Sequence, residues 1–339
     1  MGRKLWVFSL DALGDIDSAV FETLPGFKRV MKEGVYVPHM RGVYPTLTYP
    51  SHASIISGRP PKSTGIINNR RFEPGSLKHD WFWYERDIKG DTLFKSGIRA
   101  GKKIAAFLWP VSASANITSN FAEIFPTKPG QKQAILTMKN STLRTAIPIE
   151  LKFGKCRRGV EEPFLDDYTM NGTRYILDKI DPDMMFIHIL DVDVNKHEYG
   201  TDTNETRDAV TRVGQRIEQI LDWRDHHYMS EHIDVVFLSD HSQINTPNMI
   251  YPLTDFEEEG WLKSQDGCIA SYKAAPHSAG GSCYVYLNTE VENDEELQAR
   301  LKDDLAAYMK AQEGIETIYY QPEIEEMGAD PEALRSAVA

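Results

Sequence analysis

The sequence has few cysteines, three in 339 residues, and it lacks a long apolar run. Cys156, Cys268 and Cys283 are odd in number and far apart, so the sequence predicts neither a disulfide framework nor a thiolate zinc cluster. A membrane helix needs about 20 consecutive apolar residues, and no segment reaches that length. Residues 1–10 pass directly into a strand pattern rather than into a secretory signal. We therefore expect a cytoplasmic protein without a membrane partner.

Positive charge is also scarce. The chain carries 38 Lys and Arg against 50 Asp and Glu, which gives a formal net charge of −12. Such a surface repels phosphate backbones on average, so we expect no nucleic-acid polymer as a partner. The hydrophobic share of 41% and the charged share of 26% are ordinary for globular proteins and argue against a disordered or fibrous chain. Nothing in the sequence indicates an oligomeric state.

Short apolar runs alternate with helical patterns, which predicts an α/β fold with a mostly parallel central sheet and helices on both faces. The clearest expected strands are 5–10, 104–108, 184–190, 235–238 and 283–287, and the clearest expected helices are 19–33, 50–57, 205–223 and 294–312. We expect a single α/β domain over 1–339. Residues 118–178 are rich in Lys, Thr, Pro and Gly and have weak periodicity, so they are predicted to form a small inserted cap.

Acidic residues follow three of the expected strands. Asp11 ends the first run, Asp191 and Asp193 follow 184–190, and Asp240 follows 235–238. Ligands of open α/β sheets collect at the carboxyl ends of the strands, so these side chains are candidate ligands. Taken alone, Asp11 could equally be a helix cap.

Thr48 lies in the segment Thr-Tyr-Pro-Ser-His. Pro50 suits a first helical position, which places Thr48 just before a helix N-terminus, where the dipole stabilises an anion. Thr48 could be a plain N-cap, or its hydroxyl could be ionised by a metal and attack phosphorus. We interpret His52 as a hydrogen-bonding support near this hydroxyl.

Two acidic and histidine pairs are candidate metal ligands. Asp193 and His197 are four residues apart at a strand end and can converge on one cation, for which zinc or manganese is suited. Asp240 and His241 are adjacent, so they can share an ion only where the chain turns. Asp191 could compete with Asp193, but the spacing to His197 favours Asp193.

Together these motifs make the chain resemble the alkaline phosphatase superfamily, and within it the type I phosphodiesterase and nucleotide pyrophosphatase family. The resemblance extends from Lys4 to about Asp330. It implies an alkaline-phosphatase-like fold and two zinc ions. By the same resemblance, one zinc ion is bound by Asp11, Thr48, Asp240 and His241, and a second by Asp193, His197 and a late histidine. The resemblance also implies that Asn69 donates a hydrogen bond to a phosphoryl oxygen. It implies that Tyr49 forms part of an apolar substrate slot, although structural packing is an alternative role for Tyr49.

The sequence departs from the family near its end. Two-zinc members carry a final metal histidine in a His-Gly motif, whereas His277 is the only histidine after His241. We therefore expect a C-terminally shortened member whose second metal site is incomplete, and His277 is predicted to be a surface-loop residue rather than a ligand.

The resemblance implies a metal-dependent hydrolase of phosphodiester or pyrophosphate bonds in nucleotides or similar small phosphate esters, acting through a phosphothreonine at Thr48. Members that act on monoesters carry a Lys-x-Arg clamp, and residues 108–112 (LWPVS) have no cation, which favours diesters. A phosphomonoesterase or phosphonate hydrolase of the same superfamily remains an alternative, as does a degenerate homologue that binds metal without turnover.

Overall fold

The computed structural model describes residues 3–228 and 232–329. Its central sheet has five parallel strands in the order β3-β2-β4-β1-β5, which confirms the predicted α/β fold class. The strands are β1 (Lys4–Leu10), β2 (Ile104–Phe107), β3 (Ser119–Phe121), β4 (Met184–Ile189) and β5 (Ile233–Leu238). All four residues of β2 are buried, as expected for a parallel strand that is covered on both faces.

The helices alternate with the strands in sequence, and those up to α10 lie around the central sheet. They are α1 (Ser18–Phe21), α2 (Pro25–Glu33), α3 (Thr48–Ser57), α4 (Pro61–Thr64), α5 (Leu93–Arg99), α6 (Gln133–Asn140), α7 (Leu143–Phe153), α8 (Phe164–Ile180), α9 (Asp191–Tyr199), α10 (Asn204–His227), α11 (Pro252–Glu258), α12 (Thr289–Glu292), α13 (Glu295–Ala311) and α14 (Gln321–Glu326). Short 3-10 turns occupy Asp15–Asp17 and Glu85–Asp87.

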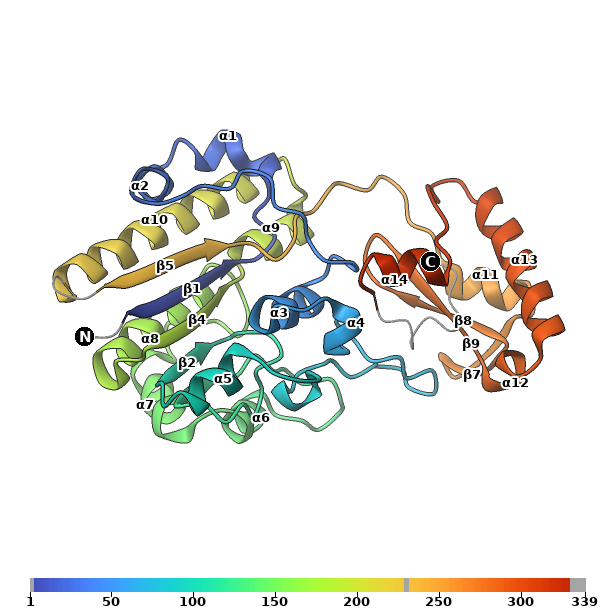
Figure 1. Ribbon diagram of the computed structural model, residues 1–339, viewed down its shortest axis with the longest axis horizontal. Coiled ribbons are helices and arrows are strands. Elements are labelled where there is room, and N and C mark those ends of the chain that lie inside the picture. Colours follow the sequence, from blue (N-terminus) through green and yellow to red (C-terminus); the bar gives the residue numbers. More distant parts are fainter. Residues whose placement is uncertain (1–2, 229–231, 330–339) are drawn as a thin grey trace.

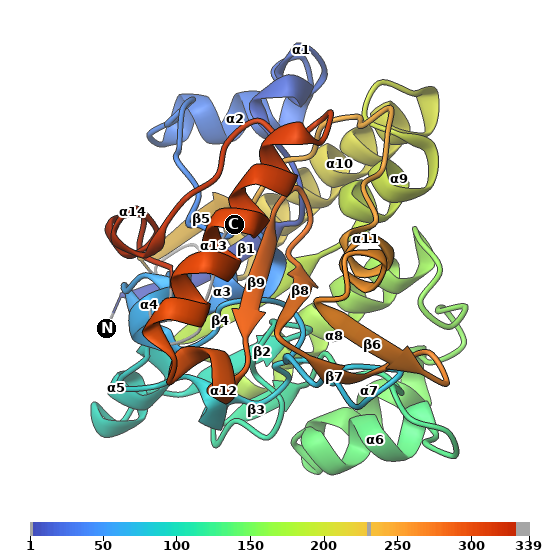
Figure 2. The same cartoon turned by 90° about the vertical axis from the view of Figure 1, so that its right-hand side faces the viewer.

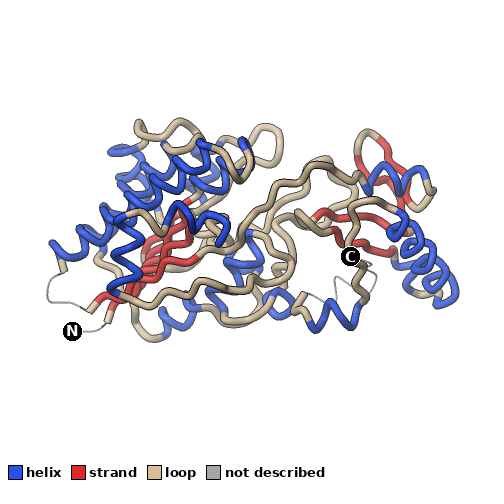
Figure 3. Tube along the Cα trace, turned by 90° about the horizontal axis from the view of Figure 1, so that it is seen from above, coloured by secondary structure: helices blue, strands red, loops and turns tan. Residues whose placement is uncertain are grey.

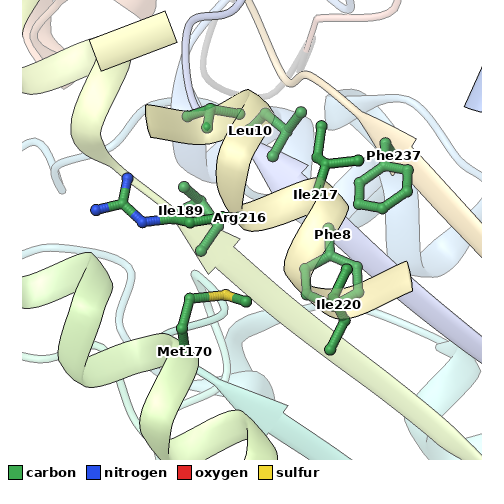
Figure 4. A pocket seen from close by; sticks show the side chains of 9 residues that line it. Phe8, Leu10, Met170, Ile189, Arg216, Ile217, Ile220 and Phe237 are labelled. Atoms are coloured by element: carbon green, nitrogen blue, oxygen red, sulfur yellow. The ribbon is translucent and has the colours of Figure 1, made fainter. Parts of the chain in front are cut away.

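Side-chain alternation along the strands creates two apolar layers. On β1, Phe8 packs with residues of α2, α8 and α10, whereas Val7 packs with residues of α3 and α5 on the opposite face. The crossing of α2 and α10 is close, because a Cβ at Gly26 would lie 2.2 Å from the carbonyl oxygen of Gly214. Under α10 a cavity of about 10 Å³ remains, and Figure 4 shows the guanidinium of Arg216 directed away from its apolar side chains.

Two helix boundaries differ from the prediction. The expected helix 19–33 is divided into α1 and α2 because the ring of Pro25 disfavours a helical Leu24, which is extended at ψ 139°. The helix expected from Pro50 begins two residues earlier, so Thr48 is the first residue of α3 rather than the residue before it. Pro50 is tolerated there because the first N–H groups of a helix have no intrahelical acceptor.

The C-terminal elements lie beyond the ends towards which β1 and β5 point (Figure 1). The expected strand at residues 283–287 is present as β9 (Cys283–Leu287), but it pairs with β8 (Ala274–Ser278) in an antiparallel hairpin outside the central sheet. Its short Gly-Gly turn permits this local pairing. A second hairpin joins β6 (Leu262–Gln265) to β7 (Cys268–Tyr272). Figure 2 shows both hairpins in front of the central sheet, and Figure 3 shows the loops that connect the two parts.

Residues 118–178 contribute to the sheet and its cover. This segment contains β3, which pairs with β2, and most of α8, which contacts β2 and β4. The division of the chain into one domain with an inserted cap stays a prediction. Within residues 3–228 and 232–329, none of the helices combines the length and apolar character that crossing a membrane requires.

Candidate metal centre

The carboxyl ends of β1, β4 and β5 meet at one edge of the sheet, because β1 pairs in parallel with both of its neighbours. Asp11 directly follows β1, α9 starts two residues after β4, and Asp240 lies two residues beyond β5. Ala12 adopts a left-handed φ of 58°, so the chain turns sharply after Asp11. Its N–H donates to Asp240 Oδ1 at 3.3 Å. The fold therefore brings together side chains that are more than 200 residues apart.

His241 is at the centre of the first cluster. Its Nε2 lies 3.1 Å from Thr48 Oγ1, 3.3 Å from Asp11 Oδ1 and 3.5 Å from Asp240 Oδ2. Candidate ligand atoms of Asp11, Asp240 and His241 all lie within 4.8 Å of one another. The structure thus assembles all four residues predicted for the first ion.

Two buried oxygen atoms test whether this cluster fits a cation. Asp11 Oδ1 and Asp240 Oδ2 are inaccessible to solvent and have no hydrogen-bond donor among the described residues. Leaving a buried carboxylate oxygen without a partner is costly. Two such oxygens beside an imidazole nitrogen and a hydroxyl match the ligand set of a divalent transition metal. The residues present therefore fit a divalent cation.

Charge repulsion and attraction oppose each other in this cluster. Burial, reinforced by repulsion from Asp193 and Asp240, raises the pKa of Asp11 well above its ordinary value. Burial acts in the same direction on Asp240, but the neighbouring His241 and His52 hold the pKa of that carboxyl below its ordinary value. Bringing a cation between these groups relieves the repulsion.

The second predicted pair is also together, on α9. Asp193 Oδ1 lies 3.5 Å from His197 Nε2 and accepts a hydrogen bond from Gln243 Nε2 at 2.7 Å. The His197 side chain is 72% exposed. In the described part of the chain, no third histidine, cysteine or acidic residue joins both of them as a candidate ligand.

His277 differs from its prediction. It lies on β8, is 5% exposed, and its Nε2 is 3.1 Å from the carbonyl oxygen of Arg70. Its ring packs near Phe72 and His79, and burial lowers its pKa to about 4. The expectation of a surface-loop histidine is wrong, because the β8–β9 hairpin packs against the segment that follows Asn69. His277 belongs to none of the candidate metal groups among the described residues.

The side chain of Asn69 lies against the start of α3, where Tyr49 is the second residue. The backbone N–H of Tyr49 donates to Asn69 Oδ1 at 2.9 Å, which fixes this amide next to Thr48. The Tyr49 side chain is 1% exposed, and its ring contacts Trp81 and Trp83 edge-on. The ring is therefore packed in the interior, and its predicted contact with a substrate stays a prediction.

Two polar residues behind the candidate ligands, His188 and Glu123, were not predicted from the sequence. His188 Nε2 lies 3.0 Å from Asp11 Oδ2, and its Nδ1 lies 3.0 Å from Glu123 Oε2. The available signal was a histidine inside the apolar strand run MMFIHIL, since a buried polar side chain requires a partner. His52, which was predicted to be a support, lies with Nδ1 2.7 Å from the Thr48 carbonyl oxygen.

A second acidic group at the same edge is already neutralised. Asp191 accepts two hydrogen bonds from Arg212, and Arg216 Nη1 lies 2.8 Å from Asp191 Oδ2 and 3.3 Å from Asp166 Oδ2. A guanidinium thus takes the position that a cation would occupy beside Asp191, and the choice of Asp193 as the metal ligand stays a prediction. Burial, with repulsion from Asp166 and Asp191, raises the pKa of nearby Glu162 to about 10.

Comparisons with known proteins find related sequences. The family model for type I phosphodiesterase / nucleotide pyrophosphatase matches residues 5–332. Human ectonucleotide pyrophosphatase/phosphodiesterase family member 1 is 25% identical over 223 residues, which are 64% of this chain and 21% of that protein. An uncharacterised pyrophosphatase/phosphodiesterase of Schizosaccharomyces pombe is 21% identical over 66% of this chain and 41% of its own length. The chain thus spans less than half the length of these relatives.

Solved structures show the same fold. Murine ectonucleotide pyrophosphatase / phosphodiesterase 5, in an inactive form in complex with AMP, has a TM-score of 0.62 at 17% identity and covers 99% of this chain and 78% of its own. Phosphonoacetate hydrolase from Sinorhizobium meliloti, in complex with phosphonoacetate, has a TM-score of 0.65 at 16% identity over 99% of this chain and 79% of its own.

The raised pKa of Glu162 makes a pH-dependent prediction. The unfolded chain releases this proton above its ordinary pKa of 4.5, whereas the folded protein keeps it to about 10. The contribution to stability is complete below pH 4.5 and is lost as the pH rises towards 10, by at most about 1.4 kcal/mol per pH unit. When the free energy of unfolding in urea is measured at pH 5 and at pH 8, the stability of Glu162→Gln relative to the parent should therefore be higher at pH 8 than at pH 5. Glu161→Gln, at the exposed neighbour, should follow the parent, and an identical pH response of both variants would contradict this pKa.

The two metal positions should differ in affinity. Four donor groups surround the first and two the second, and affinity rises with ligand number. In a calorimetric titration of the apo-protein with zinc, we expect a tight and a weak site. Asp240→Ala should remove the tight site and Asp193→Ala the weak one. Asp234→Ala, at an exposed aspartate on β5, should leave both unchanged. Two equally tight sites in the parent would disprove this ranking.

Proposed function

The chain belongs to the type I phosphodiesterase / nucleotide pyrophosphatase family, and on that premise we propose that it hydrolyses phosphodiester or pyrophosphate bonds in nucleotides or similar small phosphate esters. The observation that carries the proposal is the position of Thr48 Oγ1, 3.1 Å from His241 Nε2 and at the start of α3. His241 in turn contacts Asp11 and Asp240, whose unpartnered oxygens fit a cation, and a hydroxyl next to such a centre is suited to act as a nucleophile.

Two zinc ions are the proposed cofactors, with Asp11, Thr48, Asp240 and His241 as ligands of the first and Asp193 with His197 as ligands of the second. Zinc bound at these positions supplies positive charge that favours an ionised hydroxyl and neutralises the transferring phosphoryl group. The cytoplasm is the proposed location, which the free state of all three cysteines supports.

The residues of the chain have distinct tasks in the proposed reaction. Thr48 Oγ1 attacks phosphorus, the bond to the leaving oxygen breaks, and a phosphothreonine forms. Asn69 accepts a hydrogen bond from the Tyr49 N–H through its Oδ1, so the NH₂ end of its amide is available to donate to a phosphoryl oxygen. The positive end of the α3 dipole stabilises the same charge. Water then cleaves the phosphothreonine and restores Thr48.

Substitution of the nucleophile tests this mechanism. Thr48→Ala should lower kcat for a chromogenic diester by at least about a thousandfold, because the attacking oxygen is lost. The fold should persist, since Leu47 and not Thr48 is the N-cap of α3. Thr48→Ser should retain part of the activity, and Thr46→Ala, at an exposed threonine on the same segment, should behave as the parent. Turnover by zinc-loaded Thr48→Ala within tenfold of the parent would rule out Thr48 as the nucleophile.

Substrate class depends on the lack of a cationic clamp. Residues 108–112 contain no Lys or Arg and are buried, so a dianionic monoester gains no extra positive partner from them. We expect kcat/KM for bis(4-nitrophenyl) phosphate to exceed that for 4-nitrophenyl phosphate on the same zinc-replete protein. The reverse order would make the protein a phosphomonoesterase, and turnover of phosphonoacetate alone would make it a phosphonate hydrolase.

A further inference from the structure

Four polar side chains from separate parts of the sequence form one chain of polar contacts behind the candidate metal centre: two hydrogen bonds and a close approach of His188 to Asp11. The Tyr49 hydroxyl donates to Glu123 Oε1 at 2.7 Å, and Glu123 Oε2 lies 3.0 Å from His188 Nδ1. His188 Nε2 in turn lies 3.0 Å from Asp11 Oδ2. We call these four residues the Tyr49–Asp11 relay. It connects the residue after Thr48 with a ligand of the first ion.

Burial makes the relay a costly feature. Tyr49 is 1% exposed, His188 0% and Asp11 3%, and the Glu123 side chain is 12% exposed. Replacing buried ionic groups by apolar residues of similar volume is often neutral or stabilising, so stability alone is a weak reason to keep them. A role at the neighbouring centre accounts for this arrangement better than packing does.

The two oxygens of Asp11 have different surroundings. Oδ2 faces His188, whereas Oδ1 faces His241 and has no hydrogen-bond donor among the described residues. A polar group in contact with one oxygen of a carboxylate restricts its rotation and favours presenting the other oxygen to an ion. His188 at Oδ2 therefore favours the orientation in which Oδ1 faces His241.

His188 itself is unsuited to bind a metal. Its side chain is part of a candidate group with His52 and Asp240. However, its Nδ1 is hydrogen-bonded to Glu123 Oε2 at 3.0 Å and its Nε2 lies 3.0 Å from Asp11 Oδ2, so a carboxylate oxygen faces each ring nitrogen. A histidine acts as a ligand through a nitrogen that carries no proton. With a carboxylate at each ring nitrogen, His188 is placed as a support of Asp11 rather than as a ligand of an ion of its own.

We propose that Glu123 and His188 are positioning residues that orient Asp11 as a metal ligand, with Tyr49 anchoring Glu123. The inference deepens the proposed function and rests on it, because it concerns the ion that the function requires. Glu123 holds the His188 ring in place, and His188 holds Asp11 Oδ2. The same relay ties the first turn of α3, which carries Thr48, to the end of β1.

Zinc affinity of apo-protein variants, measured by competition with a chromophoric chelator, tests the relay. Glu123→Gln keeps the size of the side chain but turns either an amide NH₂ or a neutral oxygen towards His188. We expect it to weaken the tight site about 10- to 100-fold, the usual effect of losing a support of a ligand. Tyr49→Phe keeps the ring against Trp81 and Trp83 and should weaken zinc binding to a smaller extent.

The chain offers a matched control pair away from the site. Glu150 bridges the Tyr168 hydroxyl at 2.9 Å and the Arg157 guanidinium at 2.7 Å, just as Glu123 bridges Tyr49 and His188. Glu150→Gln and Tyr168→Phe should leave zinc affinity at the parental value. Activity gives a second readout: Glu123→Gln should lose turnover at limiting zinc and recover it at saturating zinc, with KM for the ester unchanged.

The outcomes separate the relay from the proposed function. If zinc affinity of Glu123→Gln and Tyr49→Phe stays within twofold of the parent, the relay is structural and the proposal is wrong, even where the parent hydrolyses diesters. If the parent binds zinc but hydrolyses no ester, the proposed function fails, while the affinities of the variants still decide the relay. If Glu123→Gln does not fold, Tyr49→Phe alone decides it. A parent that binds no divalent ion overturns both.

Discussion

Repulsion among Asp11, Asp193 and Asp240 is the constraint on which the rest of the site depends. Burial and mutual repulsion raise the pKa values of Asp11 and Asp193, so the carboxylates need compensating charge. Histidines supply part of it: His241 lies between Asp11 and Asp240, and His188 lies behind Asp11. The two oxygens that remain unpartnered then define where a cation fits. The protein's own groups therefore balance only part of the negative charge of these carboxylates.

The geometry of the parallel sheet brings these carboxylates close together. With β1 between β4 and β5 in a parallel arrangement, side chains that follow the three strands must share one edge. The same edge holds a second acidic group at Asp166 and Asp191, and here arginines from α10 provide the balance. The contrast separates two uses of buried acids. Where a guanidinium fills the centre the acidic charge is balanced within the protein, and where imidazoles surround unpartnered oxygens the group is suited to bind an ion.

Much of the architecture could be predicted from local patterns. Apolar runs identified β1, β2, β4 and β5, and helical periodicity identified α10 and α13. The spacing of Asp193 and His197, and the pairing of Asp240 with His241, are short-range features that survive folding unchanged. The structure brings the predicted ligands of the first ion together as expected, because residues at the carboxyl ends of parallel strands lie at the same edge of the sheet. The roles of Thr48 and Asn69 in turnover stay predictions.

The sequence by itself determined the fold class, the family and the residues that follow the strands, because each of these is encoded in periodicity or in a short motif. Only the tertiary structure decided that α3 begins at Thr48, that β9 pairs with β8, and that His277 is buried. It also decided that Glu123 and His188 stand behind Asp11. The physical reason is that these features depend on contacts between segments distant in the chain, and the hydrophobic pattern of one segment carries no information about which polar atom of another segment will face it.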